Sequence, residues 1–399
     1  MVRAGLGRGW TCLFANDIDP MKVEVYAENW GDGSVLERDI HNVRIEDLPR
    51  DAALAWASFP CQDLSCAGNG LGIGDAAGDL KTRSGTFWPF VALMKELKAQ
   101  SRLPRLMVLE NVLGLLSTNG GNDFAAVVSA VCGLGFRTGA VVVDARHFVP
   151  QSRARVFIIG VAKDVRLDAN IVRADPHDVW HPDILARAVD KLPTRIKNQW
   201  VWFDLGSAPT SKKSLEKVVT NAPTGVVWHS AAETRRLIDM MSDVHKEKLA
   251  AAKRSGKRRV GTLSLRMRPQ KGKTVQRAEV SFDGLAGCLR TPRGGGSRLR
   301  VVIVKGREVR SRLLSPTEAA QLMGLKGGYK LPPHYNNAFK VIGDGVVVPA
   351  VSFLRTRLLT PLLKASRKRK RVRKPQEANA GNPRRRRLAK HDSAEAMRI

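Results

Sequence analysis

The chain has 399 residues, of which 43% are hydrophobic, so it can bury a large core in two or three domains. Its formal net charge of +30 predicts a polyanionic partner, and the lack of a bilayer-length apolar run or a signal-peptide pattern favours a cytoplasmic protein over a membrane protein. Five widely spaced cysteines without a Cys-x-x-Cys pair predict reduced thiols, and argue against a disulfide framework or a zinc cluster.

Short apolar runs alternate with helical patterns over residues 1–164. We expect strands at residues 11–15, 52–57, 106–109, 138–143 and 156–161, and helices at residues 21–30, 87–97 and 123–133. This alternation predicts an α/β fold with a doubly wound, mainly parallel sheet. Ligands bind at the carboxyl ends of the strands in such sheets. The side chains that follow these ends would share one rim, namely Asp17, Asp39, Cys61 and Glu110.

Cys61 follows Pro60 directly after the apolar run 52–57. Proline has no amide hydrogen and a fixed φ, so the strand must stop there and leave Cys61 at its carboxyl end. A thiol in this position is a candidate nucleophile. The alternative is a small buried hydrophobic residue, because that is the commoner role of a free cysteine.

Asp17 and Asp19 stand between a short strand and the helix expected at residues 21–30. An acid at the end of a strand and before a helix often holds the ribose of a nucleoside. The alternative is that Asp19 caps the helix and that Asp17 is solvated.

The second part of the chain is more basic. Residues 165–310 lack sustained alternation and include the basic run 253–259, which predicts an irregular basic domain whose cations either contact phosphate or are solvated. In residues 311–363 a capping box at Ser315–Glu318 starts a helix, and a glycine-rich junction at 343–349 opens another. Residues 364–399 carry runs of Lys and Arg that repel one another, which predicts a disordered tail that binds nucleic acid.

Five short motifs resemble those of the cytosine-5 DNA methyltransferase family, in the family's order and over about residues 1–355. They are Pro60-Cys61-Gln62, Glu110-Asn111-Val112, Gln151-Ser152-Arg153-Ala154-Arg155, Leu314-Ser315-Pro316-Thr317-Glu318 and Gly343-Asp344-Gly345-Val346. The resemblance implies the Rossmann-like fold of methyltransferases that use S-adenosyl-L-methionine. It also makes residues 165–310 a target-recognition domain for duplex DNA.

The resemblance assigns catalytic roles to four residues. Cys61 would add to C6 of cytosine as a thiolate, because C5 alone is a poor nucleophile. Glu110 would donate a proton or a short hydrogen bond to N3, Arg155 would approach O2, and Arg153 would support the active-site loop. A stacked base cannot be attacked, so the cytosine would be flipped out of the duplex under a lid at residues 68–78.

The resemblance also implies two binding sets. For S-adenosyl-L-methionine these are Asp17, Ile18, Asp39, Ile40, Pro60, Gly343, Asp344 and Val346. For DNA they are Gln62, Ser65, Arg290, Thr291, Arg293, Gly294 and Gly295. No metal ligand is implied. We expect a monomer, with a cognate restriction endonuclease as a further candidate partner.

The chain departs from the family in two places. The family begins with a strand ending in Phe-x-Gly-x-Gly, which approaches the cofactor, whereas this chain starts with a segment that resembles the helix after that loop. We expect either a start codon placed too late or a remnant with impaired cofactor binding. Asp344 replaces a common asparagine, which exchanges an amide for an acceptor-only carboxylate. Two other functions stay open: a catalytically inactive DNA-binding protein and an RNA cytosine-5 methyltransferase.

Overall fold

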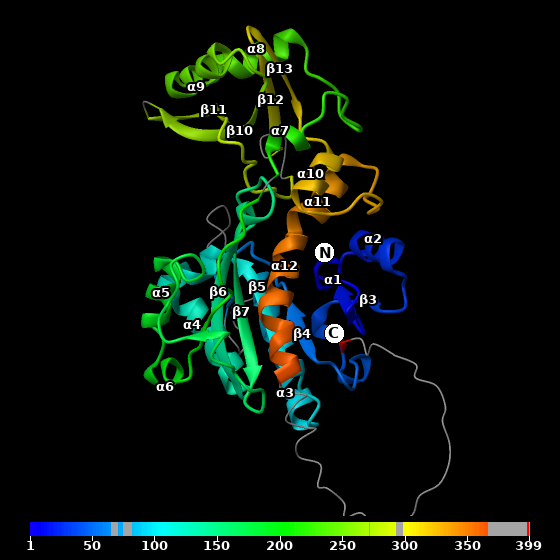
Figure 1. Ribbon diagram of the computed structural model, residues 1–399. Helices are drawn as coiled ribbons and strands as arrows, with labels where there is room; N and C mark the ends of the chain where they lie inside the picture. The colour runs from blue at the N-terminus through cyan, green and yellow to red at the C-terminus, as the bar shows by residue number, and fades with distance from the viewer. Residues whose placement is uncertain are drawn as a thin grey trace, which may run out of the picture.

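The computed structural model describes residues 1–64, 71–74, 82–211, 213–270, 272–292 and 298–365, together with the backbone of Met397–Arg398. Figure 1 shows a larger lower part that contains the N-terminus and a smaller upper part, joined through a narrower middle. The expected lid falls mainly outside the described residues, as does nearly all of the expected basic tail.

Two of the sheets in the described structure carry the predicted strands of the lower part. β2 (Ala15–Asp17) and β3 (Val35–Glu37) pair in parallel, and a second sheet has the order β4-β5-β7-β6. Its strands are β4 (Leu54–Ala57), β5 (Leu106–Val112), β7 (Ala154–Ala162) and β6 (Phe136–Asp144). β4 and β5 are parallel, whereas β7 is antiparallel to both of its neighbours. The link between β6 and β7 is too short for the crossover that parallel pairing requires.

Helices cover both faces of the four-stranded sheet, as predicted for an α/β fold. They are α1 (Val2–Leu6) and α12 (Val348–Leu354) on one face and α3 (Phe87–Ala99) and α4 (Asn122–Gly133) on the other, whereas α2 (Pro20–Trp30) packs on the sheet of β2 and β3. Alternate residues of β5 enter different buried clusters, Val108 with α1 and α12 and Leu109 with α3 and α4. This alternation is expected of a strand buried on both faces.

Residues 165–211 pack on the lower part, which differs from the second domain expected to begin at 165. β8 (Val172–Arg173) pairs with β9 (Trp202–Phe203). Between them in the chain lie α5 (Asp183–Asp190) and α6 (Thr194–Lys197). Leu185 and Ile196 of these helices join the buried cluster of α4. An amphipathic pattern gives no partner, so the sequence could not show which domain these helices cover.

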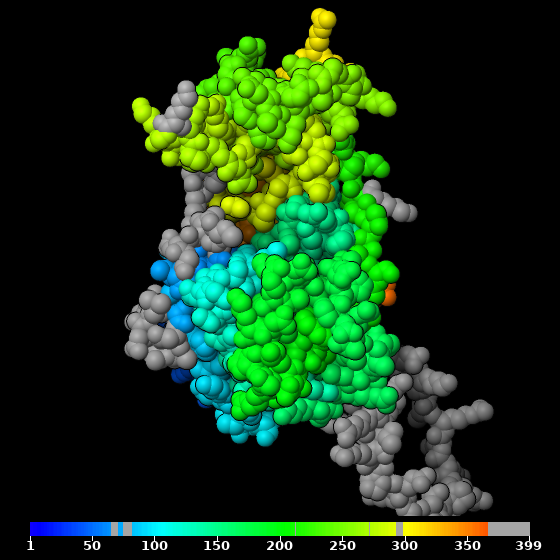
Figure 2. All heavy atoms as spheres, turned by 90° about the vertical axis from the view of Figure 1, so that its left-hand side faces the viewer, coloured from blue at the N-terminus to red at the C-terminus, as the bar shows by residue number. Residues whose placement is uncertain are grey.

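The upper part is a regular antiparallel sheet with the order β11-β10-β12-β13, where irregular structure was expected. Its strands are β10 (Arg259–Gln270), β11 (Lys273–Ser281), β12 (Arg300–Lys305) and β13 (Glu308–Leu313), and its helices are α7 (Leu215–Val218), α8 (Ala231–Asp239) and α9 (Asp243–Arg254). In the space-filling view of Figure 2 the yellow-green upper part stands above the cyan and green surface of the lower part.

The chain then returns to the lower part through α10 (Pro316–Leu322), α11 (Tyr335–Asp344) and α12, which continues as a π-helical turn at Arg355–Leu359. The predicted capping box is confirmed: Ser315 Oγ accepts from the Glu318 amide, and the Glu318 carboxylate accepts from the Ser315 amide. The helical stretch Tyr335–Ala365 is long and apolar enough to cross a membrane, but half of its most apolar window is buried in the core.

β2 and β4 each lie at an edge of their sheet. Within the described residues, β2 pairs with β3 on one side and β4 pairs with β5 on one side, so no ladder joins the two sheets. β1 (Trp10–Thr11), which precedes β2 in the sequence, pairs in parallel with β14 (Met397–Arg398). Trp56 of β4 is only half buried, unlike the residues at the centre of β5.

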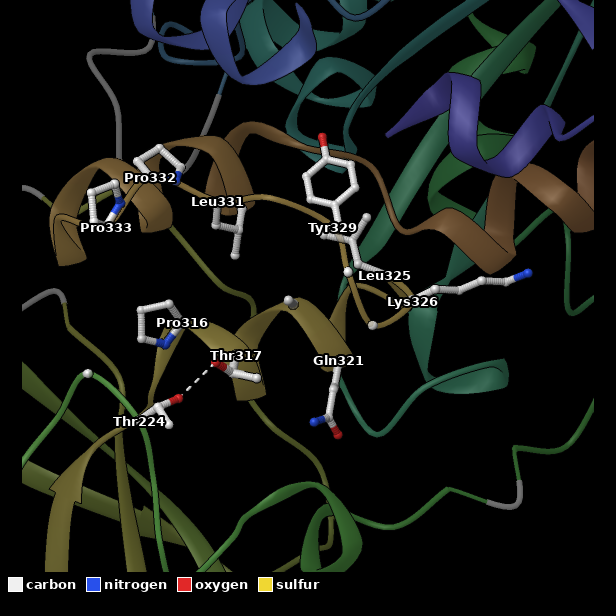
Figure 3. A pocket seen from close by; sticks show the side chains of 14 residues that line it. Thr224, Pro316, Thr317, Gln321, Leu325, Lys326, Tyr329, Leu331, Pro332 and Pro333 are labelled. Carbon is white, nitrogen blue, oxygen red and sulfur yellow. Dashed lines mark hydrogen bonds between the residues drawn. The ribbon is translucent and has the colours of Figure 1, made fainter. Parts of the chain in front are cut away.

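A cavity of about 510 Å³ lies where α10 meets the following loop (Figure 3). Thr224 and Thr317 in its lining are hydrogen-bonded to each other, with 3.1 Å between their Oγ1 atoms. None of the residues predicted to bind cofactor or DNA lines this cavity.

Candidate active site

The loop that carries Cys61 is fixed to the neighbouring strand. Asn111 of β5 donates a hydrogen bond from Nδ2 to the carbonyl of Phe59, at 3.1 Å. The buried carboxylate of Asp63 accepts from the backbone amides of Arg83 and Ser84 on the other side of the loop. Cys61 is thus held between β5 and the segment before α3 and remains partly accessible.

Glu110 and Arg155 form a pair at the ends of adjacent antiparallel strands. Arg155 Nε lies 3.2 Å from Glu110 Oε1, and Glu110 is 7% exposed. Because β5 and β7 are antiparallel, the start of β7 lies beside the carboxyl end of β5. The ion pair orients the carboxylate, since a cation held beside one carboxylate oxygen restricts the rotation of the group.

Arg153 connects three segments from inside the protein. Its Nη1 donates to the carbonyl of Leu289 at 2.7 Å, and its Nη2 donates to the carbonyls of Gly343 and Gly345, both at 2.8 Å. Burial lowers the pKa of Arg153. The predicted supporting role fits these contacts, because the side chain bonds backbone of both segments that flank the candidate cofactor site.

Two thiols near these arginines have opposite shifts. Burial raises the pKa of the Cys61 thiol, and Glu110 adds to this while Arg155 opposes it. Burial also disfavours ionisation of Cys288, but the positive charges of Arg153 and Arg155 outweigh it and lower the pKa of that thiol. Arg153 Nη1 lies 3.2 Å from Cys288 Sγ.

The residues expected to bind adenosine lie at the ends of β2 and β3. Asp17 Oδ1 accepts from the amide of Asp19, and Asp39 accepts from both the amide and the ring Nδ1 of His41. Ile18 is 63% exposed, which is uncommon for so large an apolar side chain and leaves it free to pack on a planar ring. An exposed isoleucine between acceptor groups suits an adenine and its ribose.

The glycine-rich junction contacts the segment after β11. A Cβ on Gly343 would lie 2.4 Å from the amide nitrogen of Thr291, so only glycine allows this approach. Asp344, where the family commonly has asparagine, accepts from Thr291 Oγ1 at 2.7 Å and forms an ion pair of 2.8 Å with Lys22. Lys22 thus supplies a cation for the carboxylate that the substitution introduces. Val346 is buried in the core beside this junction.

The residues expected at the DNA are only partly described. Arg83 donates from Nη1 to Gln62 Oε1, and Thr291 donates to Asp344 rather than standing free. Arg290 precedes Thr291 on the same segment. Ser65, Arg293, Gly294 and Gly295 lie outside the described residues.

Two further residues near the ends of β2 and β3 are Asp19, which was expected to cap a helix, and Ile40, which was expected to bind adenine. Although burial favours its neutral form, the hydrogen bond from Lys340 and that cation's charge lower the pKa of Asp19. Ile40 begins the short 3-10 helix Ile40–Asn42 after β3 and packs against the α3 and α4 cluster.

Several site residues were not singled out from the sequence. Cys288, Lys22, Asn111 and Asp63 all contact predicted site residues or fix their loops. Asn111 stood in a quoted motif and could have been found there. Cys288 contacts Arg153 across 135 residues of chain, a separation at which local patterns carry no signal.

Comparisons with known proteins identify the family of the chain. The family model for C-5 cytosine-specific DNA methylase matches residues 2–360. The Type II methyltransferase M.BsuFI of Bacillus subtilis is 24% identical over 88% of this chain and 68% of its own length. The Type II methyltransferase M.HhaI of Haemophilus parahaemolyticus is 22% identical over 87% of this chain and 86% of its own. The solved methyltransferase EhMeth of Entamoeba histolytica has a TM-score of 0.52 at 10% identity and covers 88% of this chain and 90% of its own, which shows the fold alone.

Proposed function

Because the chain belongs to the C-5 cytosine-specific DNA methylase family, whose model matches residues 2–360, we propose that it methylates a flipped-out cytosine through a covalent adduct on Cys61. The family relation makes it a DNA cytosine methyltransferase of the methyltransferase fold that uses S-adenosyl-L-methionine. The observation that carries the covalent step is the convergence of Cys61, Glu110 and Arg155 at one rim, where their charges act on one another.

Cys61 forms the first bond of the proposed reaction. Its thiolate adds to C6, and the electron pair of the C5–C6 double bond moves to C5, which becomes nucleophilic. S-adenosyl-L-methionine supplies the methyl group that C5 takes up. Loss of the C5 proton to a base then returns the electron pair, and the sulfur leaves C6 as thiolate.

Glu110 and Arg155 stabilise the charge that this addition creates. Electron density builds on the pyrimidine, and a carboxyl group at N3 relieves it by giving a proton or a short hydrogen bond. Arg155 holds Glu110 in place through its 3.2 Å contact, and in the proposed reaction its guanidinium group would approach O2 of the cytosine. Arg153 donates to the carbonyls of Gly343 and Gly345 as well as to Cys288 Sγ, so we assign it to positioning of the Gly343–Gly345 segment.

The cofactor would lie along the ends of β2, β3 and β4. Asp17 would hold the ribose, Ile18 the adenine face, and Asp39 with Ile40 the adenine edge, while Pro60 borders the reacting end. Gly343 and Asp344 close the other side, and buried Val346 supports them. The exposed face of Ile18 beside two acids supports this assignment.

Methyl incorporation tests the substrate. The purified chain is incubated with tritiated S-adenosyl-L-methionine and either duplex DNA or transfer RNA. We expect label in DNA at C5 of cytosine, and none with Cys61→Ala. Label confined to transfer RNA would favour the RNA enzyme, and DNA binding without label in either form would favour an inactive DNA-binding protein.

Other assignments belong to the same proposal. We propose that the enzyme acts as a monomer in the cytoplasm on duplex DNA. A cognate restriction endonuclease is a candidate partner, because the relatives that match are Type II methyltransferases. Digestion of host DNA by an endonuclease encoded beside this chain, with and without its expression, would test that partnership.

A further inference from the structure

The hairpin of β10 and β11 extends beyond the sheet that carries it. β10 pairs with β12 only over Arg259–Leu263, whereas its pairing with β11 continues to Gln270 opposite Lys273. Among the described residues, no third strand joins the distal half. We call residues 266–270 and 272–277 the ribbon. Figure 1 shows it projecting beside α9 at the edge of the upper part.

Alternation along the strands gives this hairpin two faces. Leu263 and Val280 lie on one face and join the buried cluster of α8 and α9. Val260 and its partner Ile303 lie on the other face and join the cluster that also contains the core of the lower part. Arg266 is an even number of residues from Val260 and so lies on this second face. The second face of the ribbon therefore continues the face that packs, at Val260 and Ile303, in the cluster shared with the lower part.

Two arginines on this second face share one carboxylate. Arg268 Nε lies 2.6 Å from Glu279 Oε1, and Arg266 Nε lies 3.5 Å from Glu279 Oε2. The side chain of Arg266 is 48% exposed and that of Arg268 is 52% exposed. Glu279 thus restrains both guanidinium groups while their outer edges stay accessible, as in a preorganised recognition group.

A third arginine lies directly opposite the first. Arg277 pairs with Arg266 across the ribbon and donates a hydrogen bond to Gln270 Oε1. Lys273, opposite Gln270, adds a further cation near the tip. Four basic side chains against one acid make this face strongly positive, which suits a polyanion.

We propose that the ribbon enters the major groove of the target duplex and that Arg266, Arg268 and Arg277 select the target sequence by contacting guanines. This rests on the proposed function. The major groove of B-DNA admits a two-stranded ribbon, and arginine donates in a bidentate manner to O6 and N7 of guanine. The major groove of A-form RNA is too deep and narrow for such an element, so the ribbon fits DNA better than RNA.

The test compares two double variants that remove the same charge. Arg266→Gln with Arg268→Gln changes the ribbon. Arg187→Gln with Arg235→Gln is the matched control, because both of these arginines are exposed and lie in ion pairs four residues apart on α5 and α8. Circular dichroism and the midpoint of urea unfolding confirm that each variant is folded, and Arg277→Gln repeats the test at a single position.

Affinity and target choice are read out separately. The full-length wild type and variants methylate a library of duplexes with randomised sequence, and 5-methylcytosine is located by bisulfite sequencing. We expect the ribbon variants to bind the wild-type target at least about tenfold more weakly and to lose preference for guanine at one or two positions. The control should stay within about twofold, as surface charge changes away from bases do.

Two results would overturn the proposal, and a third would overturn the proposed function on which it rests. An unchanged methylation profile would overturn the proposal, as would a uniform loss of affinity over all sequences with a smaller salt dependence, which is the mark of phosphate contacts. A wild-type protein that methylates transfer RNA or no nucleic acid would instead overturn the proposed function. The two failures are therefore distinguishable.

Discussion

Cys61 must be a thiolate to attack, and its surroundings work against ionisation. Burial raises the pKa of this thiol above its ordinary value, with Glu110 adding to the effect and Arg155 opposing it. At pH values below that pKa, the fraction of Cys61 that is thiolate rises about tenfold for each unit by which the pH increases. We expect the rate of adduct formation to rise with pH between about 6.5 and 8.5 in rapid-quench measurements. A rate that falls over this range would show that the thiolate is not the limiting form.

Arg312 of β13 and Glu318 of α10 form an ion pair that links the upper part to α10. Their side chains are almost fully buried, more so than those of any other ion pair in the described residues. Arg312 donates to both carboxylate oxygens, at 2.6 and 2.8 Å, and to the carbonyl of Thr220. Glu318→Gln leaves a buried guanidinium without its counter-charge. We expect the free energy of unfolding in urea to fall by about 3–5 kcal/mol.

An exposed pair provides the control for that substitution. Asp183→Asn removes the partner of Arg187 at the surface, where screening makes such pairs weak. Its urea midpoint should hardly change. If Glu318→Gln were as stable as Asp183→Asn, the buried pair would not stabilise the junction.

At the scale of elements, helix α1 depends on close contact with α12. A Cβ on Gly5 would lie 2.5 Å from Val351 Cβ and 2.8 Å from the carbonyl of Val348, so alanine there must push the helices apart. We expect Gly5→Ala to lower the free energy of unfolding by about 1–3 kcal/mol, measured by urea denaturation. Gly9→Ala, which would meet no atom within 4 Å, is the control and should change it little.

The elements also show how far local pattern reaches. The apolar run 106–109 predicts β5, because a strand that is buried on both faces consists of consecutive apolar residues. The residues Ser315 to Glu318 predict the start of α10, because a capping box involves only neighbouring residues. Pairing direction is not local, so the antiparallel β7 could not be read from its apolar residues. The upper sheet was missed because the ribbon end of β10 is exposed and arginine-rich, which resembles a loop. The contact between Arg153 and Cys288 required the folded chain.

At the scale of the whole molecule, the net charge of +30 contributes to the affinity for DNA more than to the choice of target sequence. By direct count residues 364–399 hold 14 basic and three acidic side chains. Removing residues 366–399 should weaken binding to non-specific duplex and make the slope of log affinity against log salt shallower, because fewer counterions are released. Fluorescence anisotropy in a salt series measures this. Unchanged slopes would show that the tail does not contact phosphates.

The central claim is that Cys61 forms a bond to the target cytosine, and covalent trapping tests it most directly. A duplex containing 5-fluorocytosine blocks the last step, since fluorine cannot leave as a proton does, and the enzyme should remain attached after denaturation. Mass spectrometry of the digested complex should then place the nucleotide on Cys61, in wild type and in Cys132→Ala but not in Cys61→Ala. An adduct that persists in Cys61→Ala, or that maps to Cys288, would contradict the account.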